Sequence, residues 1–277
     1  MRFVRYSVNR MAIRVGVRTD AGIVDTGFIE MRDLIEAGDA GLERARGAAQ
    51  SGEPVANPSI FQPILPGKIL CSGINYASHK DENPDAKMPE EPFFFSKLPS
   101  AVVGPGSPIL IPTEQTLADY EVELAMVIGR RAKRLSEEYA LDHVWGWTVL
   151  NDVSARDVQF KDLQITLGKN PDTFAPLGPE IVTMDELGDW STLSVSSTLN
   201  GETMQSAPTS EMLFSPARLL VFLTALITLE PGDVVTTGTP AGVGTFRDPP
   251  VYLKPGDTIT VSVDRIGDLT NPVAAGW

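Results

Sequence analysis

Residues 119–129 read DYEVELAMVIG, and residues 151–157, beyond a short interval with helical character, read NDVSARD. Successive side chains of a strand point to opposite faces, so the first segment places Glu121 and Glu123 on the same face. That face continues with small or branched apolar residues, which indicates a strand buried on both sides. Two acids at the end of such a strand therefore lie close together in an apolar setting.

A third acid, Asp152, follows the apolar run VWGWTVL (144–150) after one residue. Buried like charges are costly unless a cation or strong hydrogen-bond donors compensate them. Three carboxylates from two strands form the oxygen set that a hard divalent ion prefers, with positions left for water or a chelating substrate. The alternative is that Glu121 and Glu123 lie on the solvated face of an ordinary strand and that Asp152 caps a turn.

The composition is that of a soluble globular protein, with 277 residues and a formal net charge of −13. This acidity disfavours nucleic acids and anionic membranes as partners, because both need a basic surface. The single cysteine, Cys71, excludes disulfides and Cys-based zinc sites within one chain, and we interpret it as a buried hydrophobe. We expect a cytoplasmic protein, since the N-terminal residues contain no uninterrupted apolar segment typical of a secretory signal.

Two domains are predicted, with the boundary near the Pro-containing linker SGEPVANPS (51–59). Residues 1–65 form a small domain with a β meander and short helices, and residues 66–277 form the larger domain with the acidic strands. The most apolar segment, ARLLVFLTALITL, is too short for a membrane span and predicts a core helix. We expect this helix to begin after Ser215 and to end at Pro231.

The segment NYASHKDENP contains His79 and Glu82, which a short helix would place on the same side. A histidine beside a carboxylate can act as a general acid/base pair, because the carboxylate orients the imidazole and raises its basicity. A polar loop with one histidine more often has no chemical role, so the residues alone leave both interpretations open.

Three donors lie after Asp152, namely Arg156, Gln159 and Lys169. Together they could bind a carboxylate or carbonyl group. Any one of them alone is more often a surface residue. The loop TTGTPAGVG (236–244) could bring backbone N–H groups and Thr239 against an anion. It contains neither GK[ST] nor GxGxxG, so it is not a nucleotide-binding loop of either kind.

Seven segments, in order from about residue 66 to the C-terminus, resemble the fumarylacetoacetate hydrolase family: SGINYASHKDE, DYEVELAMVIG, NDVSARDVQ, GKNPDTFAPLGP, LNGETMQ, TTGTPAGVGTF and LKPGD. The resemblance implies an α+β fold that is predominantly β, a mixed β-roll with flanking helices preceded by a small N-terminal α/β domain. It also implies a homodimer that acts on a small oxo acid with Mg²⁺ or Mn²⁺, for which Ca²⁺ can substitute in a crystal.

The resemblance assigns roles to the residues already selected. It implies metal ligands at Glu121, Glu123 and Asp152; catalytic residues at His79, Glu82 and Lys169; and substrate-binding residues at Arg156, Gln159, Lys169 and Thr239. Under the same resemblance, Arg156 could chiefly brace the metal site.

The resulting hypothesis is a hydrolase of aromatic catabolism that cleaves a C–C bond in an acylpyruvate-like or fumarylpyruvate-like 2,4-dioxo acid through a metal-stabilised enolate. Hydrolysis is placed first because a His–Glu pair could activate water. The alternatives within the family are decarboxylation or isomerisation, of oxaloacetate or a 2-hydroxyhepta-2,4-diene-1,7-dioate type of acid, and lyase or dehydratase chemistry on a 2-oxo acid.

Two interpretations from other classes are disfavoured. A glycosidase could use paired acids, and residues two apart on a strand are about 6.6 Å apart, within the range of inverting enzymes. However, Glu121 and Glu123 would then lie on one side of the sugar. A metal-binding module without enzymatic activity would leave His79, Lys169 and Thr239 without a purpose.

Overall fold

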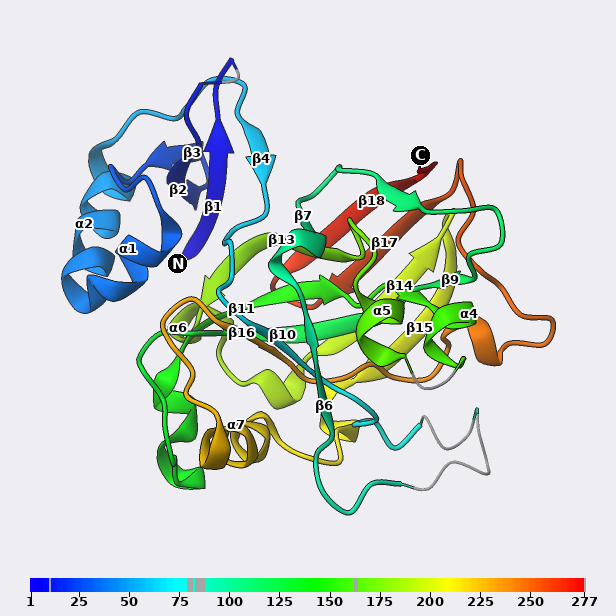
Figure 1. Ribbon diagram of the computed structural model, residues 1–277. Coiled ribbons are helices and arrows are strands. Elements are labelled where there is room, and N and C mark those ends of the chain that lie inside the picture. The colour runs from blue at the N-terminus through cyan, green and yellow to red at the C-terminus, as the bar shows by residue number, and fades with distance from the viewer. Residues whose placement is uncertain (10, 79–81, 83–87, 162–163, 277) are drawn as a thin grey trace.

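The computed structural model describes residues 1–9, 11–78, 82, 88–161 and 164–276. Within these residues, an eleven-stranded sheet and a five-stranded sheet form the body of the molecule, and helices lie around them (Figure 1). The predicted α+β fold with a predominance of strands is confirmed.

The N-terminal region forms a three-stranded meander with two helices packed beside it (Figure 1). Its elements are β1 (Arg2–Ser7), β2 (Arg14–Thr19), β3 (Gly22–Asp25), α1 (Met31–Glu36), α2 (Gly38–Ser51) and β4 (Ser59–Phe61). Strand β1 also pairs with the later strand β13 (Ala175–Thr183), with Phe3 opposite Ile181. The meander thus extends the main sheet, and the division into domains at residue 65 stays a prediction.

Strand β10 (Val122–Ile128) lies in the middle of the larger sheet, between β11 (Val144–Asn151) and β16 (Val234–Thr236). All seven of its residues are buried. Leu124 and Met126 belong to one hydrophobic core, whereas Ala125 and Val127 belong to a second core on the other face. The predicted alternation of this strand is therefore confirmed. Glu121 and Glu123 alternate in step with Ala125 and Val127, on the side of the second core.

The remaining strands complete the two sheets. The larger sheet also contains β5 (Ile69–Ser72), β6 (Phe94–Lys97) and β7 (Val102–Val103), and the smaller contains β8 (Ile109–Ile111), β14 (Ser194–Leu199), β15 (Glu202–Pro208), β17 (Thr258–Val263) and β18 (Gly267–Ala275). A separate pair consists of β9 (Ala118–Asp119) and β12 (Ser154–Ala155). Asn200 and Gly201 both have positive φ angles at the β14–β15 hairpin, as the Asn–Gly turn predicts.

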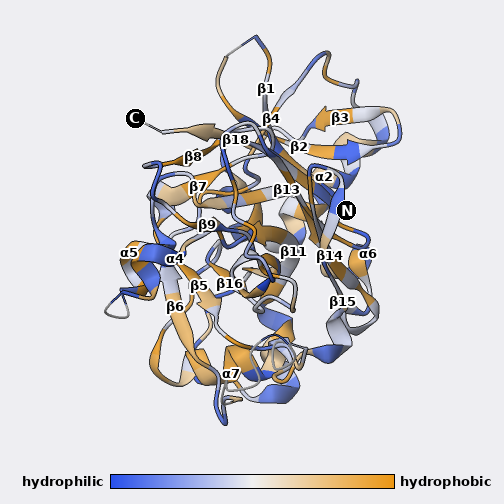
Figure 2. Cartoon of the chain, turned by 90° about the vertical axis from the view of Figure 1, so that its right-hand side faces the viewer, coloured by the Kyte–Doolittle hydropathy of each residue, from blue (hydrophilic) through white to orange (hydrophobic). Residues whose placement is uncertain are grey.

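Helix α7 (Pro216–Leu226) covers one side of the sheet and carries many apolar residues (Figures 1 and 2). The Ser215 side chain accepts a hydrogen bond from the Arg218 N–H, as its predicted N-cap role requires. The helix ends at Leu226, earlier than expected, because Leu229 runs extended and pairs with Ala132. No helix among the described residues is long and apolar enough to cross a membrane.

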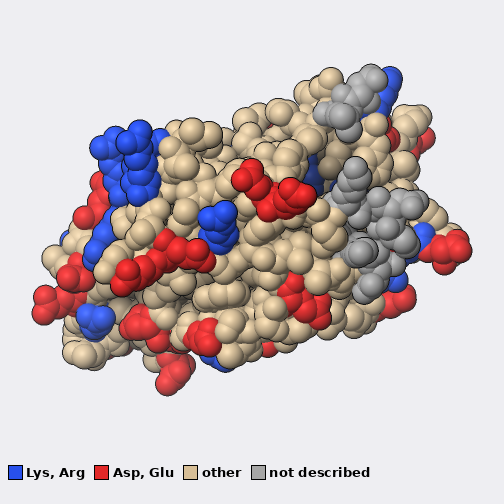
Figure 3. All heavy atoms as spheres, turned by 90° about the horizontal axis from the view of Figure 1, so that it is seen from below, with Lys and Arg blue, Asp and Glu red and all other residues tan. Residues whose placement is uncertain are grey.

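Short helices lie between the strands. They are α4 (Arg156–Gln159), α5 (Ile165–Lys169), α6 (Met184–Leu187) and five 3₁₀ turns (Pro99–Ala101, Glu137–His143, Trp190–Thr192, Thr209–Glu211 and Gly244–Phe246). On the face seen from below, acidic side chains are scattered, and the largest group of Lys and Arg lies at one end (Figure 3). The described part of that face therefore presents no broad basic surface.

Candidate metal and substrate site

The three predicted metal ligands lie together at the start of β10 and the end of β11. Glu121, Glu123 and Asp152 are all buried, and each offers a carboxylate oxygen within 4.8 Å of the others. Antiparallel pairing places Val122 opposite Asn151, and the Asp152 N–H donates to the Glu121 carbonyl at 2.9 Å. Pairing of β10 with β11 thus creates the cluster.

Buried cations neutralise part of this acidic cluster. The Lys169 ammonium donates to Glu121 Oε2 at 2.9 Å and to Asp152 Oδ2 at 2.7 Å. The Arg156 guanidinium donates to Glu121 Oε1 at 2.6 Å. Burial alone would raise the pKa of Glu121, but the charges of Lys169 and Arg156 lower it to about 2. Glu121 is therefore ionised across the physiological range.

Glu123 has much weaker compensation. Its Oε2 accepts a hydrogen bond from the Gly238 N–H at 3.2 Å. Burial, followed by the charges of Asp152 and Glu121, raises the pKa of the Glu123 carboxyl well above its ordinary range. The cluster therefore favours an added positive charge next to Glu123.

Asp119 connects Arg156 to the glycine-rich loop. Its carboxylate accepts from Arg156 Nε at 2.9 Å, from the Gly244 N–H at 2.7 Å and from the Thr245 N–H at 3.1 Å. Arg156 also donates to Gln159 Oε1 at 2.8 Å. Sequence reasoning missed Asp119, although its position next to the alternating strand is a signal that could have drawn attention to it.

Thr239 lies in the loop after β16 and lines a cavity that Glu121 and Glu123 also line. Its hydroxyl oxygen accepts from Gln205 Nε2 at 2.8 Å, and Gln205 Oε1 in turn accepts from the Val122 N–H at 3.1 Å. A hydroxyl that accepts one bond still has a hydrogen to donate, so Thr239 can donate to an anionic oxygen.

The predicted acid/base pair is only partly visible. His79 lies outside the described residues. The Glu82 carboxylate accepts a hydrogen bond from the Gly242 N–H, and the Ser78 hydroxyl accepts from the Ala241 N–H at 3.4 Å. These bonds place Ser78 and Glu82 against the glycine-rich loop that contains Thr239.

These groups surround a cavity of about 250 Å³. Its polar side is formed by residues already described, and its other side is aromatic and aliphatic. The lining residues are Ser72, Gly73, Ile74, Phe93, Phe95, Glu121, Glu123, Arg156, Gln159, Phe160, Ile165, Lys169, Thr239 and Phe246. The Lys169 ammonium also lies 4.8 Å from the centre of the Phe95 ring. The cavity is of a size that suits a small acid.

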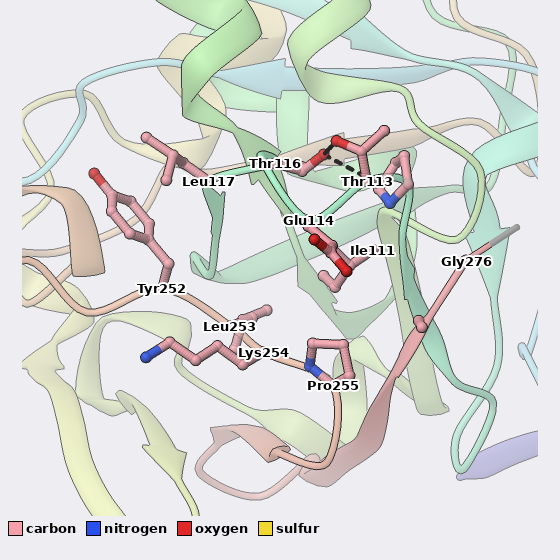
Figure 4. A pocket seen from close by; sticks show the side chains of 12 residues that line it. Ile111, Thr113, Glu114, Thr116, Leu117, Tyr252, Leu253, Lys254, Pro255 and Gly276 are labelled. Carbon is pink, nitrogen blue, oxygen red and sulfur yellow. Dashed lines mark hydrogen bonds between the residues drawn. The ribbon is translucent and has the colours of Figure 1, made fainter.

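A second cavity, of about 470 Å³, lies beside the C-terminal strand (Figure 4). Its walls include Ile111, Leu117 and Tyr252, and a hydrogen bond joins the hydroxyls of Thr113 and Thr116 at 3.1 Å. It is larger, but it contains none of the predicted site residues. We therefore assign the chemistry to the smaller cavity.

The residues of the smaller cavity fit a divalent metal ion. Three buried carboxylates from two elements supply oxygen ligands. The raised pKa of Glu123 shows that its negative charge is not compensated by the neighbouring residues. Ser72 supports the fit, because its buried hydroxyl lines the cavity and has no hydrogen-bond partner among the described residues. Such a hydroxyl suits a water bound to the ion.

Gly168 controls how closely α5 approaches α4. A Cβ atom at residue 168 would lie 2.7 Å from the Gln159 Cβ and 2.8 Å from its Cα. Gly168→Ala should therefore push α5 outwards, lower stability by about 1–3 kcal/mol and raise the KM for an oxo acid through displacement of Lys169. Steady-state kinetics and thermal unfolding check this, with Gly47→Ala as a control because a Cβ there meets no atom within 4 Å. Equal kinetics for the two variants would contradict the packing argument.

Metal binding should depend on pH because of Glu123. A carboxyl with a raised pKa holds its proton in the metal-free protein, and a metal ion must displace that proton. The affinity for Mn²⁺ should therefore fall as the pH decreases through this pKa. At pH values below this pKa, binding of Mn²⁺ should release a proton. Calorimetric titration in buffers of different ionisation enthalpy measures this release; a pH-independent affinity would contradict it.

Oxygen ligands for a hard cation beside donors for an anion are typical of enzymes that use a divalent metal to activate small carboxylate-bearing substrates. This protein is such a metal-dependent enzyme. The chain belongs to the fumarylacetoacetate hydrolase family, since the family model described as "Fumarylacetoacetate (FAA) hydrolase C-terminal" matches residues 68–274.

Known proteins resemble the chain over nearly its whole length. "Oxaloacetate tautomerase fahd2, mitochondrial" from Xenopus laevis is 42% identical over 288 residues, covering 99% of this chain and 90% of that protein. The crystal structure of a putative HpcE protein from Mycobacterium smegmatis has 34% identity and a TM-score of 0.90, with 99% of each chain covered. Maleylpyruvate hydrolase from Sphingobium sp. SYK-6, solved with manganese(II) and pyruvate, has 30% identity and a TM-score of 0.83, with 100% of each chain covered.

The expectation of a cytoplasmic protein is wrong. The relative from Xenopus laevis is named as mitochondrial, and so are relatives from Bos taurus and Homo sapiens. The single cysteine and the lack of an uninterrupted apolar segment among the N-terminal residues, on which the expectation was based, do not distinguish these compartments. The homodimer stays a prediction, which light scattering coupled to size-exclusion chromatography would test.

Proposed function

We propose that the protein interconverts the keto and enol forms of a short 2-oxo dicarboxylic acid of the oxaloacetate type. The observation that carries this proposal is the position of Glu121, Glu123, Arg156 and Lys169 at one wall of a cavity of about 250 Å³, with Asp152 buried directly behind them. Relatives that share about two fifths of their residues with this chain are named oxaloacetate tautomerases. This proposal revises the order of the sequence-based hypotheses, which placed hydrolysis first.

When bound by Glu121, Glu123 and Asp152, Mg²⁺ or Mn²⁺ would supply a Lewis acid for the oxygens of a 2-oxo acid. Lys169 acts as a donor and not as a base: burial disfavours its charge, but the charges of Asp152 and Glu121 outweigh this and raise its pKa. Its ammonium therefore orients the acid at the polar wall. Thr239 and Gln159 contribute further hydrogen bonds to the substrate.

Proton transfer is assigned to His79, with Glu82 as its orienting partner. Keto–enol interconversion moves one proton between carbon and oxygen and requires no water as a nucleophile. One base would suffice for this transfer, and the contact of Glu82 with Gly242 supports the assignment because it places Glu82 at the loop that contains Thr239. His79→Ala should therefore retain Mn²⁺ affinity and lose turnover by about 10²-fold or more.

Hydrolysis of an acylpyruvate is the second candidate. It is favoured by the aromatic side of the cavity, where Phe93, Phe160 and Phe246 could contact an acyl group. The Sphingobium relative is itself named a maleylpyruvate hydrolase.

A parallel assay of the Mn²⁺-loaded protein separates the two candidates. Interconversion and decarboxylation of oxaloacetate are followed beside cleavage of an acylpyruvate and of a dienoate diacid. We expect the largest kcat/KM for oxaloacetate interconversion, and the Lys169→Met variant should lose it. A larger kcat/KM for acylpyruvate cleavage would overturn the proposal in favour of the hydrolase.

A further inference from the structure

Lys97, at the end of β6, is a fully buried lysine that sequence reasoning did not select. Its side chain has an exposed fraction of 0%. The ammonium donates to Asp152 Oδ1 at 2.5 Å, to the Val153 carbonyl at 3.0 Å and to the Lys169 carbonyl at 2.5 Å. These three bonds use all three of its hydrogens. Lys97 does not line the cavity, so it acts through other residues.

The bond to Asp152 fixes the orientation of its carboxylate plane. Lys97 holds Oδ1, whereas Oδ2 is the atom shared with the Lys169 ammonium. Outer partners of this kind orient the groups that bind a metal ion. Rotation of this plane would break the bond to Lys97, so the lysine holds the other oxygen beside the Lys169 ammonium.

The bond to the Lys169 carbonyl fixes the end of α5. Carbonyls at the end of a helix have no partner within the helix, and Lys97 supplies one here. Asn170 strengthens the same connection, because its Oδ1 accepts from the Leu98 N–H at 2.5 Å and its Nδ2 donates to the Ser96 carbonyl at 3.1 Å. The end of β6 therefore sets the position from which the Lys169 side chain reaches the cavity.

We propose that Lys97 is a positioning residue that holds both a metal ligand, Asp152, and a substrate donor, Lys169, in their working geometry. The substrate half of this inference rests on the proposed function, whereas the metal half does not. Charge and orientation predict opposite effects of removing Lys97 on the affinity for a divalent ion. Removal of a cation beside a divalent ion should strengthen binding, since like charges repel, whereas loss of orientation should weaken it.

The test measures Mn²⁺ binding to Lys97→Met, whose side chain has similar length but neither charge nor donors. Free Mn²⁺ is quantified by its electron paramagnetic resonance signal, and the affinity should fall about 10–100-fold. Lys68→Met is the matched control, because Lys68 pairs with the buried Asp233 at 2.6 Å but lies outside the cavity. Its Mn²⁺ affinity should equal that of the wild type. An equal or tighter affinity for Lys97→Met would overturn the metal half.

Two further variants complete the test. Lys97→Gln, which retains one donor group, is measured in the same way and decides the metal half if Lys97→Met does not fold. Asn170→Ala keeps the buried lysine but loosens the end of α5, because Asn170 bonds both to the end of β6 and to the Thr166 carbonyl of that helix. This variant should bind oxalate more weakly at saturating Mn²⁺, while its Mn²⁺ affinity is unchanged. Lys97→Met should also bind oxalate more weakly at saturating Mn²⁺, and unchanged oxalate binding in that variant would overturn the substrate half. Because neither measurement requires turnover, a wild type that binds Mn²⁺ but leaves oxaloacetate unchanged would refute the proposed function alone.

Discussion

Glu123→Gln should raise the stability of the metal-free protein and at the same time abolish tight binding of Mn²⁺. Glu123 is buried beside two other acids, and its carboxyl accepts a bond from the Gly238 N–H at 3.2 Å. Glutamine has nearly the same shape without the charge, so metal-free stability should increase by about 1–3 kcal/mol, the scale of burying an imperfectly paired polar group. Loss of one of three oxygen ligands should weaken Mn²⁺ binding by about 10²-fold or more.

The gain in stability should depend on pH. Burial and the neighbouring acids raise the pKa of Glu123 in the folded state above its ordinary value of 4.5. An acid of this kind contributes stability below pH 4.5, and the contribution is lost as the pH rises through the raised pKa. In EDTA, the difference in Tm between Glu123→Gln and the wild type should therefore be small below pH 4.5 and grow as the pH rises from 4.5 to the raised pKa.

Glu121→Gln is the matched control for this prediction. Its carboxylate accepts bonds from Arg156 and Lys169, which lower its pKa to about 2. The same chemical change should therefore destabilise the metal-free protein, because it removes the partner of two buried cations. If both variants lower Tm in EDTA at neutral pH, the assignment of Glu123 as the uncompensated acid is wrong.

Arg156→Met should destabilise the protein by about 3–5 kcal/mol, the usual cost of removing one partner from a buried ion pair. Arg156 donates to Asp119 at 2.9 Å and to Glu121 at 2.6 Å, and all three side chains are buried. Without the guanidinium, the buried Asp119 loses its cation, and Glu121 keeps only Lys169. Urea unfolding in EDTA measures the change in the free energy of unfolding.

An exposed arginine provides the comparison. Arg131 pairs with Glu230 at 3.2 Å, but both side chains are largely exposed. Arg131→Met should therefore change the free energy of unfolding by less than about 0.5 kcal/mol. A similar loss for Arg156→Met and Arg131→Met would show that the buried network contributes little.

The clustering of the three carboxylates could be predicted from the sequence because the relevant pattern is local. Alternation along one strand put Glu121 and Glu123 on the same face, and the apolar residues around them indicated that the face is buried. The end of the next apolar run supplied Asp152, which antiparallel pairing brought beside Glu121. The family resemblance then gave roles to Lys169 and Thr239, which both line the cavity.

Contacts between residues far apart in the sequence could not be predicted in this way. Lys97 and Asp152 are separated by 55 positions, and no local period relates a lysine at a strand end to an acid on another strand. The pairing of β1 with β13 is equally non-local, so composition near residue 65 could not reveal that the N-terminal strands continue the main sheet. The early end of α7 has the same origin, because pairing of Leu229 with Ala132 overrides local helix preference.

The central claim is that Glu121, Glu123 and Asp152 hold a divalent ion on which the conversion of a 2-oxo acid depends. The most direct measurement is the rate of oxaloacetate keto–enol interconversion, followed by ultraviolet absorbance, with Mn²⁺, after exhaustive EDTA treatment and after Mn²⁺ is restored. We predict that chelation abolishes the enzymatic rate, that Mn²⁺ restores it in the wild type, and that Mn²⁺ does not restore it in Glu123→Gln. A full rate in protein shown by elemental analysis to be free of metal would contradict the account.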